Sequence, residues 1–261
     1  MKARLGVVIL IIAMVLCNVG LLAGCSSSTT NEEGYSDEAF IKSMSKGLEA
    51  RWAMTDKASE GEETKEDMEK YIQAELDQLT PYEAAKFEDT KLQEKVLKYI
   101  NCLKESKDNI DAYFNGDEKW EEIRGERAAL IKDFVENYGL TVSDKYQAKL
   151  DEFVAQGSAV EKKASQDDAM QKLVKKTKFK QTKDDGYGWK TYESILENTT
   201  DYDIVSFSLD VNLLDKDGVN VSTQYASVEN VKKGQKAILK FETNEVFDKI
   251  DLTLSYYELK Q

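Results

Sequence analysis

The stretch of sequence that decides the fold is SAVEKKASQDDAMQKLVKKTKFKQTK, residues 158–183. Before it, apolar residues recur every three or four positions, which is typical of one face of an α-helix; after it they recur every second position, as on one face of a β-strand. The stretch carries eight lysines and three acidic residues, a net charge of +5 in a chain whose net charge is −13. We therefore expect an α+β protein with two segregated domains, a helical bundle over residues 35–176 and a β domain over residues 177–261.

Four amphipathic stripes precede the stretch and a fifth continues into it, and their apolar faces are narrow enough to predict an antiparallel bundle. We expect the helices to begin near Ser36, Thr64, Thr90, Asn115-Gly116-Asp117 and Ser143. Two stripes contain a charged residue at an apolar position, Glu75 and Arg127. The predicted core includes Trp52, Trp120, Cys102 and, on the last stripe, Met170, Leu173 and Val174.

Local signals refine these helices. Thr80 followed by Pro81 and Glu83 predicts an N-cap and a short helix to about Phe87. Gly139 occupies the place of a left-handed C-cap, and Gly157 is expected to mark an irregularity in the last helix.

After the stretch, short alternating segments and turn signals about every ten residues predict an antiparallel β-sandwich close to an immunoglobulin (Ig) domain in size. Apolar residues alternate from Val205 to Leu213, and Asp215–Gly218 and Lys232–Gln235 read as turns. Trp189 is expected to anchor the core on the first long strand. Of Tyr256 and Tyr257, one must leave the core because neighbouring strand residues face opposite sides.

The N-terminus carries Leu22-Ala23-Gly24-Cys25 after a basic start and the apolar run Leu5–Leu16. It resembles the lipobox of bacterial lipoproteins. The resemblance implies that residues 1–24 are a signal peptide, that Cys25 becomes the lipidated first residue, and that residues 25–34 are a polar tether. It also implies a location on the outer face of the bacterial cytoplasmic membrane. A retained membrane helix and an ordinary signal peptide are the alternatives; Asn18 and Gly20, which interrupt the apolar run, argue against the membrane helix.

A second resemblance covers about the last 75 residues of the sequence. Asn198-Thr199-Thr200-Asp201, Val211 to Gly218, Gly234-Gln235 and Phe241 are similar to the FxLYD family of small Ig-like modules in bacterial lipoproteins. The chain departs from that pattern with Val211 in place of the Phe and Leu214 in place of the Tyr. The helical half is similar to uncharacterised lipoproteins of Gram-positive Firmicutes. Neither resemblance implies a catalytic residue.

Composition excludes several chemistries. The chain has no histidine, which removes histidine-dependent nucleophilic triads and the commonest zinc ligand. If Cys17 leaves with the signal peptide and Cys25 carries lipid, Cys102 is the remaining cysteine and no intramolecular disulfide forms. The strongly acidic balance argues against nucleic acid as a partner.

The remaining candidate sites each have a simpler structural interpretation. Asp215–Gly218 resembles part of a calcium loop, but Leu213 and Gln224 then stand where acidic ligands are required, so we expect a turn. The row Lys176, Lys178, Lys180 and Lys183 fits protection of an edge strand or an interdomain hinge better than a grip on teichoic acid or phospholipid headgroups. The acidic pairs are expected on solvated helix faces: Asp117-Glu118, Glu121-Glu122 and Asp151-Glu152.

We therefore expect a non-catalytic binding module at the cell envelope, anchored through Cys25, without cofactor or metal. Its partner is expected to be an envelope protein, a peptide or a wall polymer. The alternatives are a small-molecule or peptide receptor, which a sizeable apolar cavity favours, and a carboxylate-dependent wall hydrolase, which two facing carboxyls in a cleft favour. A closed bundle with an exposed aromatic patch favours the binding module.

Overall fold

The computed structural model describes residues 34–58 and 63–260. The chain divides into two units, Met1–Tyr35 and Ser36–Gln261, and the described helices and strands belong to the second. The predicted signal peptide, the predicted lipid attachment residue Cys25 and nearly all of the predicted tether lie outside the described residues.

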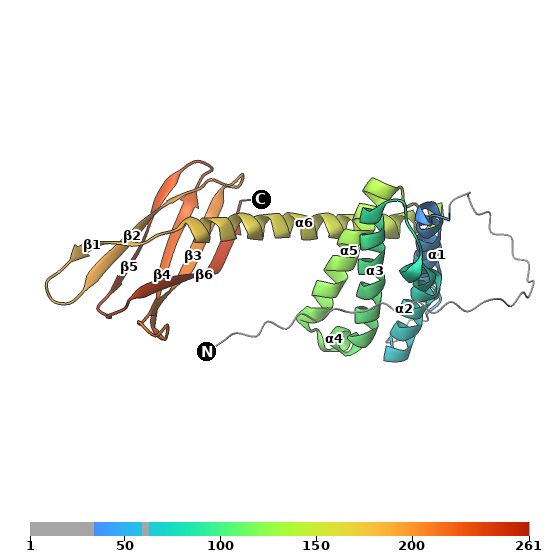
Figure 1. Ribbon diagram of the computed structural model, residues 1–261, viewed down its shortest axis with the longest axis horizontal. Coiled ribbons are helices and arrows are strands. Elements are labelled where there is room, and N and C mark those ends of the chain that lie inside the picture. Colours follow the sequence, from blue (N-terminus) through green and yellow to red (C-terminus); the bar gives the residue numbers. More distant parts are fainter. Residues whose placement is uncertain (1–33, 59–62, 261) are drawn as a thin grey trace, which may run out of the picture. The chain divides into compact units, whose positions relative to one another are not determined.

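The first part of the second unit is helical, and the second part consists of two antiparallel sheets, so the predicted α+β class is confirmed (Figure 1). The helices are α1 (Asp37–Thr55), α2 (Lys65–Leu79), η1 (Thr80–Ala84), α3 (Thr90–Asp108), α4 (Ile110–Asn115), α5 (Glu118–Tyr138), η2 (Asp144–Tyr146) and α6 (Gln147–Lys176). In the bundle, α1 packs against α2, α3 against α5, and α5 against α6.

Most helix ends follow the predicted signals. The Thr64 hydroxyl accepts a hydrogen bond from the Asp67 amide at 3.2 Å, and the Asp67 carboxylate accepts one in return from the Thr64 amide. Gly116 and Gly139 end helices with φ of +66° and +70°, a backbone conformation that glycine adopts without strain. The prediction for Thr80 was wrong: its hydroxyl donates to the Leu76 carbonyl at 2.8 Å, so it continues α2 into a 3₁₀ helix that stops at Ala84.

The bundle core is continuous and rich in aromatic side chains. Phe40 and Tyr99 both meet the ring of Phe134 edge to face, with centroids 5.5 and 5.7 Å apart. Trp52 is buried, as predicted, and Trp120 packs against the core while partly exposed. Burial of each such side chain stabilises the fold by about 1.5–3 kcal/mol. Together these side chains fill the interior of the bundle.

Gly157 sets the distance between α5 and α6. A Cβ atom at this position falls 2.5 Å from the carbonyl oxygen of Ala128 and 2.9 Å from Cβ of Lys132. The two helix backbones are in direct contact at this point, which only a residue without a side chain permits. The irregularity predicted at Gly157 is wrong, because the residue lies inside an unbroken helix.

The β region comprises β1 (Lys180–Asp184), β2 (Lys190–Glu197), β3 (Ile204–Leu214), β4 (Asn220–Val231), β5 (Lys236–Thr243) and β6 (Lys249–Leu259). The strand orders are β1-β2-β5 and β4-β3-β6, with every pairing antiparallel. Phe207, Leu209 and Val211 of one sheet share a core with Leu196 and Phe241 of the other. The predicted turns are confirmed at Gly218 and Gly234, whose φ values are +82° and +75°.

Two packing expectations for the β region are wrong. Met170, Leu173 and Val174, on the last turns of α6, lie in the core of the sheets and not in that of the bundle. The apolar stripe of α6 therefore packs into the bundle core near its start, at Leu150, and into the core of the sheets near its end. Trp189 precedes β2 and is 51% exposed, because the hairpin it belongs to projects beyond the pairing with β5. Tyr256 and Tyr257 behave as predicted, with Tyr256 exposed and Tyr257 half-buried.

We predict that Gly157→Ala lowers the free energy of unfolding by about 1–3 kcal/mol, since the added methyl group must push α5 and α6 apart. Chemical denaturation followed by circular dichroism measures the effect. Gly125→Ala is the matched control, because its Cβ meets only the partly exposed side chain of Val160 at 3.3 Å. Helix propensity makes that control neutral or stabilising by up to about 1 kcal/mol; equal losses for the two variants contradict the close approach.

Candidate functional site

A buried ionic cluster lies at the centre of the bundle and draws on four helices. The carboxylate of Glu75 on α2 is fully enclosed and accepts two hydrogen bonds from Arg127 on α5, at 2.8 and 3.1 Å. Arg51 on α1 approaches the same carboxylate at 3.1 Å, and the hydroxyl of Tyr99 on α3 donates to it. On α1, Gly47 leaves room for Glu75, since a Cβ there lies 3.3 Å from its Cγ.

The two guanidinium groups decide the charge of this cluster. Burial alone raises the pKa of Glu75, but Arg127 and Arg51 outweigh it and hold that pKa below the ordinary value of 4.5. Burial together with the neighbouring carboxylate raises the pKa of Tyr99 well above 10.0. Glu75 is therefore ionised and Tyr99 neutral at physiological pH.

The cluster belongs to the core and not to a binding cleft. Glu75 and Tyr99 are both 0% exposed, so no ligand in solution reaches them. The guanidinium of Arg127 lies 4.8 Å from the ring centroid of Phe153 on α6, which encloses it further. Cys102 is also buried as predicted, and burial raises the pKa of its thiol to about 12, which makes it a poor nucleophile.

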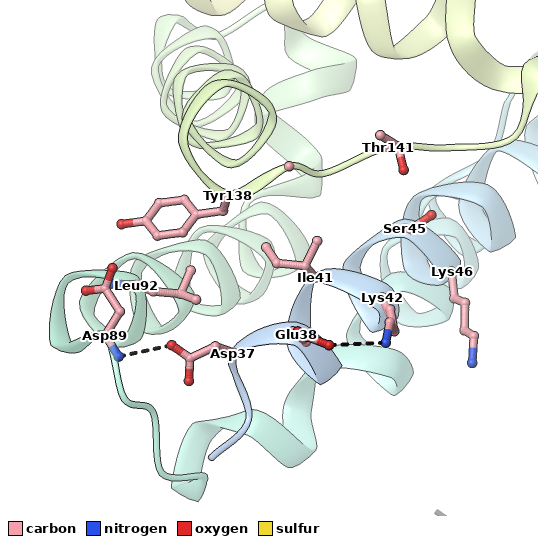
Figure 2. A pocket seen from close by; sticks show the side chains of 11 residues that line it. Asp37, Glu38, Ile41, Lys42, Ser45, Lys46, Asp89, Leu92, Tyr138 and Thr141 are labelled. Carbon is pink, nitrogen blue, oxygen red and sulfur yellow. Dashed lines mark hydrogen bonds and ion pairs between the residues drawn. The ribbon is translucent and has the colours of Figure 1, made fainter. Parts of the chain in front are cut away.

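A surface groove of about 620 Å³ opens on the bundle where the first half of α1 meets the start of α3 and the end of α5 (Figure 2). Ile41, Leu92 and Tyr138 give it apolar lining, and Lys42, Ser45, Lys46 and Thr141 add polar groups. This size is within the range of known ligand pockets, about 300–1,000 Å³. The groove is concave and open to solvent.

The carboxylates of the groove already have partners. Asp37 accepts backbone hydrogen bonds from Glu88 and Asp89 at 2.9 and 3.0 Å, which fixes the chain entering α3 (Figure 2). Asp89 caps α3 by accepting from the amides of Lys91 and Leu92. Glu38 pairs with Lys42 at 3.5 Å. These acidic groups therefore position backbone and each other, and they do not face one another as a catalytic acid and base do.

A second exposed surface lies around α4. Tyr113 and Phe114 are 38% and 40% exposed, with ring centroids 4.9 Å apart, and Trp120 at the start of α5 lies 5.2 Å from Tyr113. The Tyr113 hydroxyl donates to Glu63 at 3.1 Å. The bundle is thus closed inside and bears an aromatic patch outside, the combination that favours a binding module.

The other sequence candidates occupy structural positions. The three acidic pairs on the helices are exposed, and Asp117 caps α5 by accepting from the Lys119 amide at 2.9 Å. The carboxylate of Asp215 accepts from the amides of Asp217 and Val219, both at 2.9 Å, so it holds a turn. Within residues 34–58 and 63–260, no group of three or more acidic or cysteine side chains gathers as a metal site would require.

None of the described helices is long and apolar enough to cross a bilayer. Comparisons with protein-family models, with curated proteins and with solved structures each gave no match to this chain.

Sequence reasoning had one signal for the ionic cluster and none for the groove. Glu75 and Arg127 both stood at apolar positions of their helical stripes, which marks a charged residue that turns inward. Their pairing depends on how α2 and α5 meet in space. The groove residues come from three separate segments, and no spacing pattern joins them.

We predict that Glu75→Gln lowers the free energy of unfolding by about 3–5 kcal/mol, because it leaves two arginines in the core without a counter-charge. Urea denaturation of the purified protein measures this loss. The matched control is Glu83→Gln, which removes an exposed pairing with Lys104 and is expected to cost less than about 1 kcal/mol.

The pH dependence gives this prediction a second readout. Because the folded pKa of Glu75 is depressed, its stabilisation is complete above about pH 4.5 and is lost as the pH falls through the folded pKa. The difference between wild type and Glu75→Gln should therefore be full at neutral pH and shrink in acid. A difference that stays constant down to low pH contradicts an ionised Glu75.

Proposed function

We propose that this chain is a lipid-anchored extracytoplasmic protein of a bacterial cell envelope that acts by binding and not by catalysis. The groove at the α1–α3–α5 junction is the surface through which it holds a segment of a partner protein or wall polymer. The groove is the single observation that carries the proposal, because it combines apolar lining, hydrogen-bonding side chains and charges of both signs in one concave surface.

The anchor rests on the lipobox residues and on Cys25. Two acyl chains on Cys25, with about 0.8 kcal/mol per buried methylene group, hold a protein stably at a membrane without a transmembrane helix. Nine residues, Ser26–Gly34, then separate the anchor from Tyr35, and they span at most about 30 Å when fully extended. A groove partner is therefore sought near the membrane surface.

Binding suits the groove better than either alternative. A small-molecule receptor buries about 70–90% of its ligand, whereas this groove is open to solvent. A glycosidase needs one carboxyl with a raised pKa in a dry pocket. The groove carboxylates Asp37 and Asp89 instead accept backbone hydrogen bonds.

We also propose that the β region is an Ig-like sandwich of the FxLYD type. Its support is the sharing of one core by the two sheets and the role of Asn198, the first residue of the family-like sequence. The fully buried side-chain amide of Asn198 donates to the carbonyls of Tyr202 and Val231, at 2.8 and 2.9 Å, and so ties the β2–β3 connection to β4. This role is structural and leaves binding to the surface.

The anchor predicts the behaviour of Cys25→Ala. The variant should leave the membrane fraction or accumulate as an uncut precursor, because neither lipid attachment nor cleavage before residue 25 can then occur. Cell fractionation with gel migration measures both outcomes. A variant that fractionates and migrates like the wild type contradicts lipidation at this residue.

The groove predicts a position-specific cross-link in intact cells. A photo-reactive benzoylphenylalanine in place of Lys46, which lines the groove, should capture one dominant species, identified by mass spectrometry. Thr141→Trp fills the groove from an exposed position and should reduce that adduct about tenfold or more.

Two controls make the cross-link decisive. Thr253→Trp places the same bulky side chain on an exposed residue of β6, away from the groove, and should leave the adduct unchanged. The photo-reactive residue at exposed Glu122 should not capture the same species. An adduct that forms equally from both positions, or that survives Thr141→Trp, rules out the groove as the binding surface.

A further inference from the structure

Three lysines meet in a second groove, on the outer face of the sheet β1-β2-β5. This groove has a volume of about 470 Å³ and is lined by Lys176, Lys178 and Lys180, with Ile195, Ile238 and Glu193 beside them. The two isoleucines are paired across β2 and β5 and are 71% and 60% exposed. The surface thus joins a row of cations to an exposed apolar strip.

The backbone holds the three lysines in place. Lys176 is the last residue of α6, and Lys180 opens β1 opposite Glu193. Between them, the amide of Lys178 donates to the Ser194 hydroxyl at 3.2 Å. Phe179 turns inward, with its ring 5.0 Å from that of Phe241, so its two neighbours point outward.

Most of the positive charge of this groove is uncompensated. Among the described residues, no carboxylate lies within 4.0 Å of the ammonium groups of these three lysines. Lysines elsewhere in the described residues do form ion pairs, for example Lys42, Lys95, Lys132 and Lys240. The ammonium group of Lys176 donates a hydrogen bond to the Thr199 hydroxyl at 3.2 Å. Glu193 is the one carboxylate that lines the groove, which leaves a local charge of +2 in a chain of net charge −13.

Edge protection explains only part of this row. Lys180 and Lys183 do lie on the edge strand β1, where a lysine discourages pairing with another chain. Lys176 lies on a helix and Lys178 on the connection before the strand, so neither residue belongs to the edge strand itself. Their convergence with Lys180 on one concave surface needs another reason.

We propose that this groove binds a linear phosphodiester polymer. Lys178 and Lys180 are alternate residues of extended backbone, whose Cα atoms lie about 6.6 Å apart. This spacing is similar to the charge repeat of a chain with one phosphate per three-carbon unit. The phosphates face the lysines, and the carbon units lie on Ile195 and Ile238. A single polymer chain fits into a concave groove more readily than a flat bilayer surface fits against it. The inference depends on the proposed function only for its place of action.

The test measures binding of a fluorescent glycerol phosphate oligomer to the full-length protein in a non-ionic detergent. The variant Lys176→Gln/Lys178→Gln/Lys180→Gln should bind roughly 100-fold more weakly, because each lysine contributes about fivefold and the three factors multiply. The control Lys162→Gln/Lys216→Gln/Lys249→Gln removes the same charge from exposed lysines outside the groove and should stay within about twofold of wild type. Circular dichroism checks that both variants fold.

Salt dependence and competitors separate the sources of the signal. With three contacts, the logarithm of the affinity should fall with the logarithm of salt with a slope of about −2, and the groove variant should lose most of that slope. Equal weakening by the groove and control variants overturns the proposal. So does equal competition by poly-glutamate, which shows a charge effect without phosphate preference, or by a short-chain phosphatidylglycerol, which shows a lipid headgroup site. Cell fractionation of Cys25→Ala tests the location independently.

Discussion

The contact on which the helical part depends is the carboxylate of Glu75 between two arginines. It connects α1, α2, α3 and α5 at one point, and the stacking of Arg127 on Phe153 adds α6. A buried charge is tolerated only when its partners are in place, since an unpaired one costs several kcal/mol. The helices therefore meet in one arrangement, because any other separates Glu75 from its arginines. Apolar stripes alone, which tolerate sliding, do not impose this constraint.

Closing the bundle around this cluster determines where function can reside. The interior holds aromatic rings and an ionised carboxylate paired with two arginines, and solvent does not reach Glu75 or Tyr99, so neither group is available to a ligand. Recognition is consequently left to the surface, at the ends of helices and along the outer face of a sheet. The groove near α1 and the lysine groove near β1 are both assembled from several segments, as binding surfaces on rigid elements generally are.

The sequence predicts what depends on local chemistry and fails where distant segments meet. The capping box at Thr64, the left-handed glycines 116 and 139 and the turns of the sheets follow from neighbouring residues. Thr80 was misread because its hydroxyl has two available partners, and the preceding carbonyl of Leu76 was the better one. Gly157 was read as a weakness because its partner, the Ala128 carbonyl, is remote in sequence. For the groove of α1, α3 and α5, no periodic pattern relates the contributing residues at all.

The basic stretch between the two kinds of structure illustrates how the fold and the proposed phosphate groove are related. Helix α6 continues unbroken to Lys176, and its last turns are fixed because Leu173 and Val174 lie in the core of the sheets. Lys176 and the two lysines after it are thus attached to ordered backbone, so little backbone entropy is lost when they bind a ligand. The acidic charge of the rest of the chain does not cancel them, because at physiological salt charges separated by more than about 8 Å are largely screened. A small basic groove can therefore act on a polyanion although the protein as a whole is acidic.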